Sequence, residues 1–357
     1  MKRRDFLKDA ALLAAAAAAA PSLASACVGN KEAGAEAPAG DIAGHFRFRS
    51  DGSFTVLQFT DTHYISGDPR SRRALDCVNE ALDAVKPDLV IHTGDILFGR
   101  PDIASAREIL QPLAARGIPF AVALGNHDSQ FGSRREEVFQ AIRDIPGCLN
   151  RAPKEGVYGC SNDVITLSGA RGMERVFYLF DSMDAVTLKW EEKKHCYDYI
   201  RQSQIAWYRA HSAQFAADNG GVPVPALAFF HIPLCEIKEA LASGAQPVGN
   251  NYEPPCPSRL NSGLYAQFVE MQDVEAVVTG HDHDDDYVLP YGPLHFIYGR
   301  YSGCDTVYNH LGRNGWTEDE KISGTRIFRF HEGKSGFETW VRLQGGEEQQ
   351  KLSLHTL

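Results

Sequence analysis

The sequence predicts a single large α/β domain, and three observations support this prediction. Between residues 46 and 345, segments with the composition of buried strands alternate with segments that have the spacing of amphipathic helices. No low-complexity stretch interrupts this run, and no internal repeat divides it. The chain has 357 residues, 43% of them hydrophobic, which is enough apolar material for one extended core.

Five apolar segments are predicted to be buried strands because they are short and rich in β-branched or aromatic residues. They are 54–59, 88–93, 119–124, 225–230 and 274–279. Two more strands, over 157–169 and 175–182, are expected in a second sheet region. A closing β-hairpin is expected over 324–343, and residues 346–357 are assigned to a C-terminal tail.

Amphipathic helices are predicted between these strands. Apolar residues recur at helical spacing from Leu75 to Val85, and Pro87 ends that helix. Similar patterns predict helices over 134–145 and over roughly 200–217. Strands and helices therefore alternate as they do in α/β proteins.

The charge balance excludes one broad class of function. The chain has 36 basic and 46 acidic residues, which give a net charge of −10. A general nucleic-acid partner is not expected, because nothing here neutralises a phosphate backbone over an extended surface. A small phosphorylated substrate at one local site is compatible with this charge.

The first 26 residues have the features of an export signal. A basic head that contains Arg3 and Arg4 precedes an alanine-rich stretch and a group of small residues. This segment resembles the bacterial twin-arginine signal, and it is too short and too rich in alanine for a transmembrane anchor. Residues 27–45 are expected to form a flexible tether.

Cys27 leaves two interpretations of the processing step open. Ala24-Ser25-Ala26 fits an ordinary signal-peptidase site, which predicts a periplasmic protein. Cys27 after a small residue instead resembles a lipobox, although the usual leucine stands one place too far away, at Leu23. We favour lipid attachment at Cys27, which predicts a membrane-surface lipoprotein that meets the membrane only through this lipid.

Polar residues follow each of the five buried strands. In chain order they are Asp61 and His63, Asp95, then Asn126, His127 and Asp128, then His231, and finally His281 and His283. In open α/β sheets, ligands gather at the carboxyl ends of the strands. A glycine precedes three of the five groups, which permits sharp turns and close backbone approach. We therefore expect these side chains to converge on one site.

The residue types at this site predict metal binding. Carboxylate, imidazole and amide oxygen together suit divalent Zn, Mn or Fe. Seven candidate ligands are too many for one tetrahedral zinc, but they suffice for two ions if one carboxylate bridges them. They are Asp61, His63, Asp95, Asn126, His231, His281 and His283. No C-x-x-C motif occurs, so a cysteine zinc site is disfavoured.

The ordered motifs D-x-H, G-D, G-N-H-D, a single His and G-H-x-H resemble the signature of calcineurin-like metallophosphoesterases over roughly residues 50–345. The segments FFHIPL, YDYIRQSQIAWY and VVTGHDHDDDY resemble more narrowly the branch that is related to purple acid phosphatases but is not purple. Phe98 stands where the purple enzymes have an iron-binding tyrosine, which makes a ferric tyrosinate doubtful. The resemblance implies a four-layer αββα sandwich with its site at the strand ends.

The resemblance also implies how the ligands divide between the two ions. One ion would bind Asp61, His63 and His283. The other would bind Asn126, His231 and His281, with Asp95 bridging the two.

Such a centre predicts hydrolysis of phosphate esters. A hydroxide held between two ions near neutral pH would attack phosphorus in line. His127 is the candidate general acid for the leaving group, with phosphate binding as its alternative role, and Asp128 is the candidate that orients it. The ligands do not decide between a monoester and a diester, which depends on loops such as 129–165 and 236–262. A surface protein that binds metal or phosphate without turnover is the alternative from another class.

Other polar residues receive simpler interpretations. His92 is expected in the core or behind the metal ligands. Asp284, Asp285 and Asp286 are expected to form a solvated turn, with support of the metal ligands as the alternative. Arg300-Tyr301 follows a strand-like segment and is a candidate for contact with the substrate.

Overall fold

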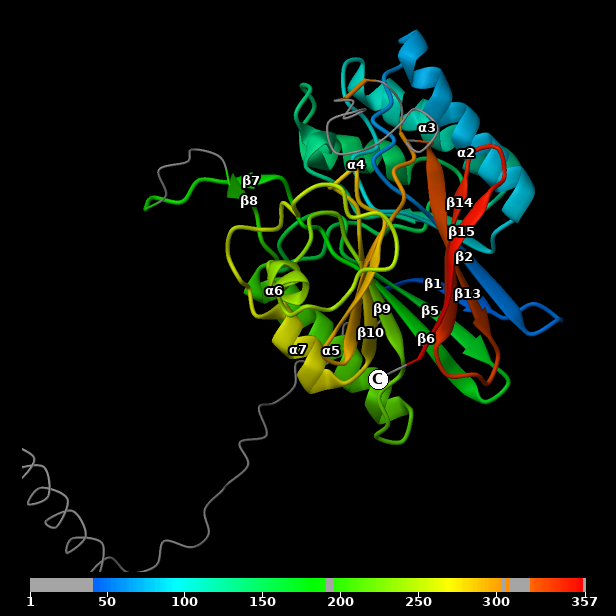
Figure 1. The fold of residues 1–357 in the computed structure, drawn as a ribbon, viewed down its shortest axis with the longest axis vertical. Helices are drawn as coiled ribbons and strands as arrows, with labels where there is room; N and C mark the ends of the chain where they lie inside the picture. The colour runs from blue at the N-terminus through cyan, green and yellow to red at the C-terminus, as the bar shows by residue number, and fades with distance from the viewer. Residues whose placement is uncertain (1–40, 191–195, 304–305, 308–321, 356–357) are drawn as a thin grey trace, which may run out of the picture. The chain divides into compact units, whose positions relative to one another are not determined.

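The computed structural model describes residues 41–190, 196–303, 306–307 and 322–355 (Figure 1). The predicted export signal, Cys27 and the tether up to residue 40 lie outside these described residues. Among the helices of the described residues, none combines the length and the apolar character needed to cross a membrane.

The first sheet has six strands in the order β15-β14-β13-β2-β3-β4. Its parallel part consists of β2 (Ser53–Phe59), β3 (Leu89–His92) and β4 (Phe120–Val122). Its antiparallel part adds β13 (Gly324–His331), β14 (Phe337–Leu343) and β15 (Glu348–Leu354). The strands of the parallel part thus end on one common edge.

The second sheet has seven strands in the order β1-β5-β6-β9-β10-β12-β11. These are β1 (Ile42–Arg47), β5 (Asp163–Gly169), β6 (Gly172–Leu179), β9 (Ala226–Phe229), β10 (Val274–Thr279), β12 (Leu294–Tyr298) and β11 (Val288–Tyr291). Strands β6, β9, β10 and β12 run parallel, and β11 closes the far edge antiparallel. A separate two-stranded ribbon consists of β7 (Ala185–Val186) and β8 (Cys196–Tyr197).

Helices cover the outer face of each sheet (Figure 1). On the first sheet they are α2 (Arg72–Val85), α3 (Asp102–Arg116) and α4 (Arg135–Arg143). On the second sheet they are α5 (Gln202–Asp218), α6 (Glu236–Ala242) and α7 (Leu264–Met271). Two 3₁₀ turns, η1 (Pro69–Ser71) and η2 (His127–Ser129), complete the described helical segments.

The alternation of side chains along β2 shows why four layers form. Phe54 and Val56 point into the core between the two sheets. Leu57 and Phe59 point the other way, into the core beneath α2, α3 and α4. Successive residues of a strand face opposite sides, so a strand that is apolar on both sides must be covered on both. The predicted four-layer αββα architecture is confirmed.

Two segments at the ends of the domain differ from the prediction. Residues 42–47 form β1, which pairs with β5, so the tether predicted to reach residue 45 is too long. Residues 348–354, predicted as part of a tail, form β15 and pair with β14. β15 is not recognisable as a strand from the sequence because most of its residues are polar. Its contacts with the core between the sheets come from Leu352 and Leu354.

Candidate metal centre

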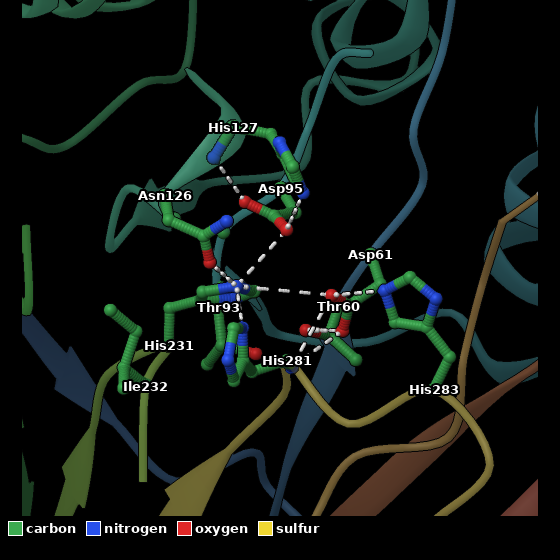
Figure 2. A network of polar contacts seen from close by, with 12 residues as sticks. Thr60, Asp61, Thr93, Asp95, Asn126, His127, His231, Ile232, His281 and His283 are labelled. Carbon is green, nitrogen blue, oxygen red and sulfur yellow. Dashed lines mark hydrogen bonds and ion pairs between the residues drawn. The ribbon is translucent and has the colours of Figure 1, made fainter. Parts of the chain in front are cut away.

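Five strands from the two sheets deliver the predicted site residues to one place. β2, β3 and β4 belong to the first sheet, whereas β9 and β10 belong to the second. Backbone hydrogen bonds join the loops that follow them. The His63 N–H donates to the Asp95 carbonyl at 3.0 Å, and the Gly280 N–H donates to the His231 carbonyl at 3.2 Å. Figure 2 shows the resulting network of side chains.

The backbone of the centre is strained. The φ values of Asp61, His63, Asp95 and His281 are 55°, 47°, 53° and 82°. These values lie in the left-handed region, which is unfavourable for residues other than glycine. Such conformations cost roughly 1–3 kcal/mol each and persist where the surrounding structure enforces them, often at functional sites. Four of the eight non-glycine residues with positive φ in the described part of the chain lie here, which marks this edge as a site.

Two of the predicted glycines are required by close approach. A Cβ atom on Gly125 would overlap the Asp95 carboxylate, and one on Gly280 would overlap the Thr60 hydroxyl. Both contacts involve the loops that hold metal-ligand candidates. The glycines thus let neighbouring loops pack closely enough for their side chains to meet.

Four side chains form the first group of the centre. The ligand atoms of Asp61, His63, Asp95 and His283 all lie within 4.8 Å of one another. His63 Nε2 and His283 Nε2 are 2.9 Å apart, and His283 Nε2 lies 3.4 Å from Asp61 Oδ1. Two imidazole nitrogens thus converge with carboxylate oxygens on one point, which is the arrangement a divalent ion requires.

Asp95 also belongs to a second group, with His231 and His281. His231 Nε2 lies 3.2 Å from Asp95 Oδ2, 3.3 Å from His281 Nδ1 and 3.1 Å from Asn126 Oδ1. On the other side of the ring, His231 Nδ1 lies 2.7 Å from the Thr93 carbonyl, so this nitrogen donates and Nε2 faces the centre. Two groups that share Asp95 suit two metal ions.

The charges of the centre also fit bound cations. Asp61 and Asp95 are buried, and among the described residues their carboxylates form ion pairs with histidines. Burial opposes ionisation of Asp61, but the charge of His231 and hydrogen bonds from His283 and His63 hold the pKa of its carboxyl well below the usual range. The pKa of Asp95 is likewise lowered, against its burial, by His231 and His127. Two buried anions whose ion-pair partners in the described part of the chain are histidines call for cations.

The histidines are predominantly in the form that binds metal. Burial lowers the pKa of His63 to about 4 and that of His281 to about 3, so both rings are neutral at pH 7. Burial also opposes the charged form of His231, but the carboxylates of Asp95 and Asp61 raise its pKa to about 9. A divalent ion would replace this proton, because both compete for the same ring nitrogen.

His127 lies beside the centre and is partly open to solvent. Its side chain is 28% exposed, and its Nε2 atom is 3.9 Å from Asp95 Oδ2. Its backbone N–H donates to Asp95 Oδ1 at 2.8 Å, and its Nδ1 lies 2.7 Å from Gln130 Oε1. The Phe98 ring packs edge-on against it at 4.7 Å. His127 is thus held in place yet accessible to a ligand.

The prediction that Asp128 orients His127 is wrong. The buried Asp128 carboxylate accepts hydrogen bonds from the backbone N–H groups of Asp95, Ile96 and Gly125. It is turned toward the loop that carries Asp95, and Gln130 takes the predicted place beside His127. Adjacent side chains diverge here because η2 points them in different directions.

The prediction of a solvated turn at residues 284–286 is also wrong. All three aspartates are buried, as is Asp282. We call residues 282–286 the acidic turn. Its carboxylates accept hydrogen bonds from a distant loop: Asp282 from the N–H of Cys256, Asp285 from that of Tyr252 and Asp286 from that of Asn250. Packing of residues 250–256 over the turn removes it from solvent.

Arg300, a candidate for contact with the substrate, is held by groups of the protein. Its side chain is buried, lies 2.7 Å from Asp286 and donates to the Ile322 carbonyl. Tyr301 packs its ring 5.1 Å from that of His283. His92 is buried, as predicted, and its Nε2 lies 3.1 Å from the Thr62 hydroxyl.

Three supporting residues were not predicted from the sequence. The Thr60 hydroxyl donates to Asp61 Oδ2 at 2.6 Å, and the Thr93 carbonyl orients His231. Their places next to the metal motifs are a signal that could have found them. The Tyr197 ring lies 4.3 Å from the His281 ring, and no local pattern indicates that contact.

Comparisons with known proteins agree with this geometry. The model of a family described as calcineurin-like phosphoesterase matches residues 54–285. "Probable inactive purple acid phosphatase 28" of Arabidopsis thaliana is 30% identical over 334 residues, with 83% of this chain and 82% of that protein covered. Phosphatase DCR2 of Saccharomyces cerevisiae is 25% identical, over 84% of this chain and 55% of that protein.

A solved structure shows the same fold. A dimetal phosphatase from Danio rerio superposes with a TM-score of 0.56 at 15% sequence identity. The match covers 85% of this chain and 99% of that one.

Proposed function

Because the chain belongs to the calcineurin-like phosphoesterase family, we propose that it hydrolyses phosphate esters at a centre that holds two divalent metal ions. One observation carries the proposal: two groups of buried donors share the Asp95 carboxylate. A pair of ions needs a carboxylate shared between two groups of imidazole ligands, whereas a single ion does not need a shared ligand.

The proposed ligands follow from the two groups. One ion would be held by Asp61, His63 and His283, the other by Asn126, His231 and His281, and Asp95 would contact both. The donors suit Zn, Mn or Fe. When bound, two such ions would lower the pKa of water toward about 7 and stabilise negative charge on phosphoryl oxygens.

His127 is the proposed proton donor to the leaving group. Its partial exposure supports access to an ester, and the contact of Nδ1 with Gln130 leaves Nε2 directed toward the centre. The aromatic contact with Phe98 restricts the ring further. Proton transfer from a side chain positioned in this way is typically worth about 10²–10⁴-fold in rate.

A non-catalytic protein that binds metal or phosphate is the second candidate. The relative from Arabidopsis thaliana has "probable inactive" in its name, which favours this candidate. The presence of His127 beside a complete set of donors favours turnover, because a protein that only binds has no need of a proton donor.

The test is metal-dependent hydrolysis. Protein stripped of metal and reloaded with Mn, Zn or Fe(II) would be assayed with para-nitrophenyl phosphate and bis-para-nitrophenyl phosphate, beside His127→Ala. Turnover that requires metal and falls by about 10²-fold or more in the variant supports the enzyme. The preferred ester distinguishes a monoesterase from a diesterase. Two bound ions without turnover of either ester would favour the binding protein.

We also propose that the protein acts after export, on the outer side of the inner membrane or tethered there through Cys27. The twin-arginine-like segment and the cysteine after Ala26 support this proposal. Lipid attachment predicts that Cys27→Ser moves the protein from the membrane fraction to the soluble fraction. Replacement of Arg3 and Arg4 by lysine should retain it in the cytoplasm; normal export of that variant would contradict a twin-arginine signal.

A further inference from the structure

The two-stranded ribbon brings a tyrosine to the metal centre. Among the described strands, β7 and β8 pair only with each other and belong to neither large sheet, and Figure 1 shows them apart from both. Tyr197 is the last residue of β8. Its ring lies 4.3 Å from that of His281, with an interplanar angle of 89°. An element outside the layered core thus contacts a metal-ligand candidate directly.

The position of Tyr197 is fixed from both sides. The Arg259 N–H donates to the Tyr197 carbonyl at 3.2 Å, and the Asp198 N–H donates to the Asp184 carbonyl at 3.3 Å. Nearby, the Cys256 N–H is held by Asp282 of the acidic turn. The ribbon and the loop that contains Cys256 therefore form one wall beside His281.

The Tyr197 hydroxyl is available as a donor. The side chain is half-buried, and among the residues that the structure describes its hydroxyl has no hydrogen-bond partner. A tyrosine hydroxyl that lacks a protein partner can donate a hydrogen bond to a bound ligand.

A phosphate ester bound at this centre would accept such a hydrogen bond through its phosphoryl oxygens. Two of the described buried arginines are paired within the protein, Arg135 with Asp181 and Arg300 with Asp286. The His127 ring lies 5.6 Å from that of His63, which belongs to the first group of the centre. The Tyr197 ring lies beside that of His281, which belongs to the second group.

We propose that Tyr197 is a substrate-binding residue whose hydroxyl donates a hydrogen bond to a phosphoryl oxygen on the His281 side of the centre. This inference rests on the proposed function, since it takes a phosphate ester as the ligand. It deepens that function by naming a binding contact that the metal ligands do not supply.

The test compares Tyr197→Phe with Tyr199→Phe in metal-loaded protein. The first substitution removes only the hydroxyl and keeps the ring on His281. The second makes the same change two residues away, where the ring packs 3.8 Å from the Arg201 guanidinium and, among the described contacts, meets no metal-ligand candidate. Metal content, affinity for inorganic phosphate by titration calorimetry and KM for para-nitrophenyl phosphate are measured for all three proteins.

Tyr197→Phe should keep both ions but bind inorganic phosphate about 10- to 100-fold more weakly, as expected for loss of one hydrogen bond to a charged group. Tyr199→Phe should bind within about twofold of the unaltered protein. Unchanged phosphate affinity in Tyr197→Phe would overturn the proposal. Loss of metal from that variant would also overturn it, in favour of a role in holding His281.

Failure of the proposed function gives a different result. If the unaltered protein binds two ions and phosphate but hydrolyses neither ester, the hydrolase is refuted. The phosphate affinities still decide the role of Tyr197, because they require no turnover.

Discussion

Two clusters of buried carboxylates lie side by side in this protein, and different partners hold them. In the metal centre, Asp61 and Asp95 face imidazole rings. In the acidic turn, Asp285 accepts a backbone N–H and Asp286 pairs with Arg300. The acidic turn is continuous in sequence with part of the metal centre, because Asp282 lies between the metal-ligand candidates His281 and His283.

The pKa values follow the partners. Both carboxyls of the centre have lowered pKa values. In the acidic turn, burial raises the pKa of Asp282 to about 7 and that of Asp285 to about 9, whereas Arg300 and Arg326 lower that of Asp286 against its burial. In the acidic turn, protonation therefore reduces the negative charge of Asp282 and Asp285, and neighbouring arginines balance that of Asp286. The centre is anionic and needs bound cations, which is how a site for metal differs from a structural cluster of the same residue type.

The largest expected effect is on the centre. Asp95→Ala should reduce hydrolysis by roughly 10⁴-fold, because it removes the carboxylate shared by both groups. The measurements are kcat/KM and metal content, with Asp83→Asn, an exposed residue remote from the centre, as the control. Two retained ions and normal turnover in Asp95→Ala would contradict the shared-ligand role.

The next effect is on the stability of the acidic turn. Asp286→Asn should lower the free energy of unfolding by about 3–5 kcal/mol, because it removes the buried carboxylate that pairs with Arg300. Urea unfolding of the metal-free protein measures this directly. A loss below about 1 kcal/mol would mean that the ion pair does not hold this turn.

Removal of metal should destabilise the unaltered protein by a smaller amount. Ions that bind only the folded state stabilise it by about 2.7 kcal/mol when free metal is at 100 times Kd. A chelator should therefore lower the Tm, and Mn or Zn should restore it. The same shift should occur in Asp285→Asn, and a chelator without effect on either protein would argue against a metal centre.

Asp285→Asn should have the smallest effect, below about 1 kcal/mol when unfolding is measured at about pH 4 or below, where this carboxyl is largely protonated in both the folded and the unfolded state. With a folded pKa of about 9 this carboxyl is already protonated, and the amide oxygen still accepts from Tyr252. Because the folded pKa exceeds the unfolded value of about 4, the contribution of Asp285 to stability falls as pH rises from about 4 toward 9. The variant should lose this dependence, and unfolding at pH 6 and at pH 9 tests it. If the free energy of unfolding changes equally with pH in both proteins, the group responsible for the pH dependence is not Asp285.

The sequence by itself determined the architecture and the members of the centre. Strand segments such as 54–59 are recognisable because hydrophobic composition is a local property. The candidates from Asp61 to His283 follow strands directly, and the ends of parallel strands are brought to one edge by the fold class itself. The strands and the ligand candidates that directly follow them could thus be predicted from the sequence, because their positions depend on residues nearby in the chain.

Only the tertiary structure decided which side chains support these ligands. Gln130 rather than Asp128 meets His127 because η2 turns adjacent side chains apart. The acidic turn is buried because a loop about 30 residues away in sequence donates its N–H groups to it. β15 is anchored in its sheet by two leucines that pack against the core. Tyr197 contacts His281, which is 84 residues away in the sequence. These contacts join distant segments, and their geometry arises from packing, which no local pattern of residues encodes.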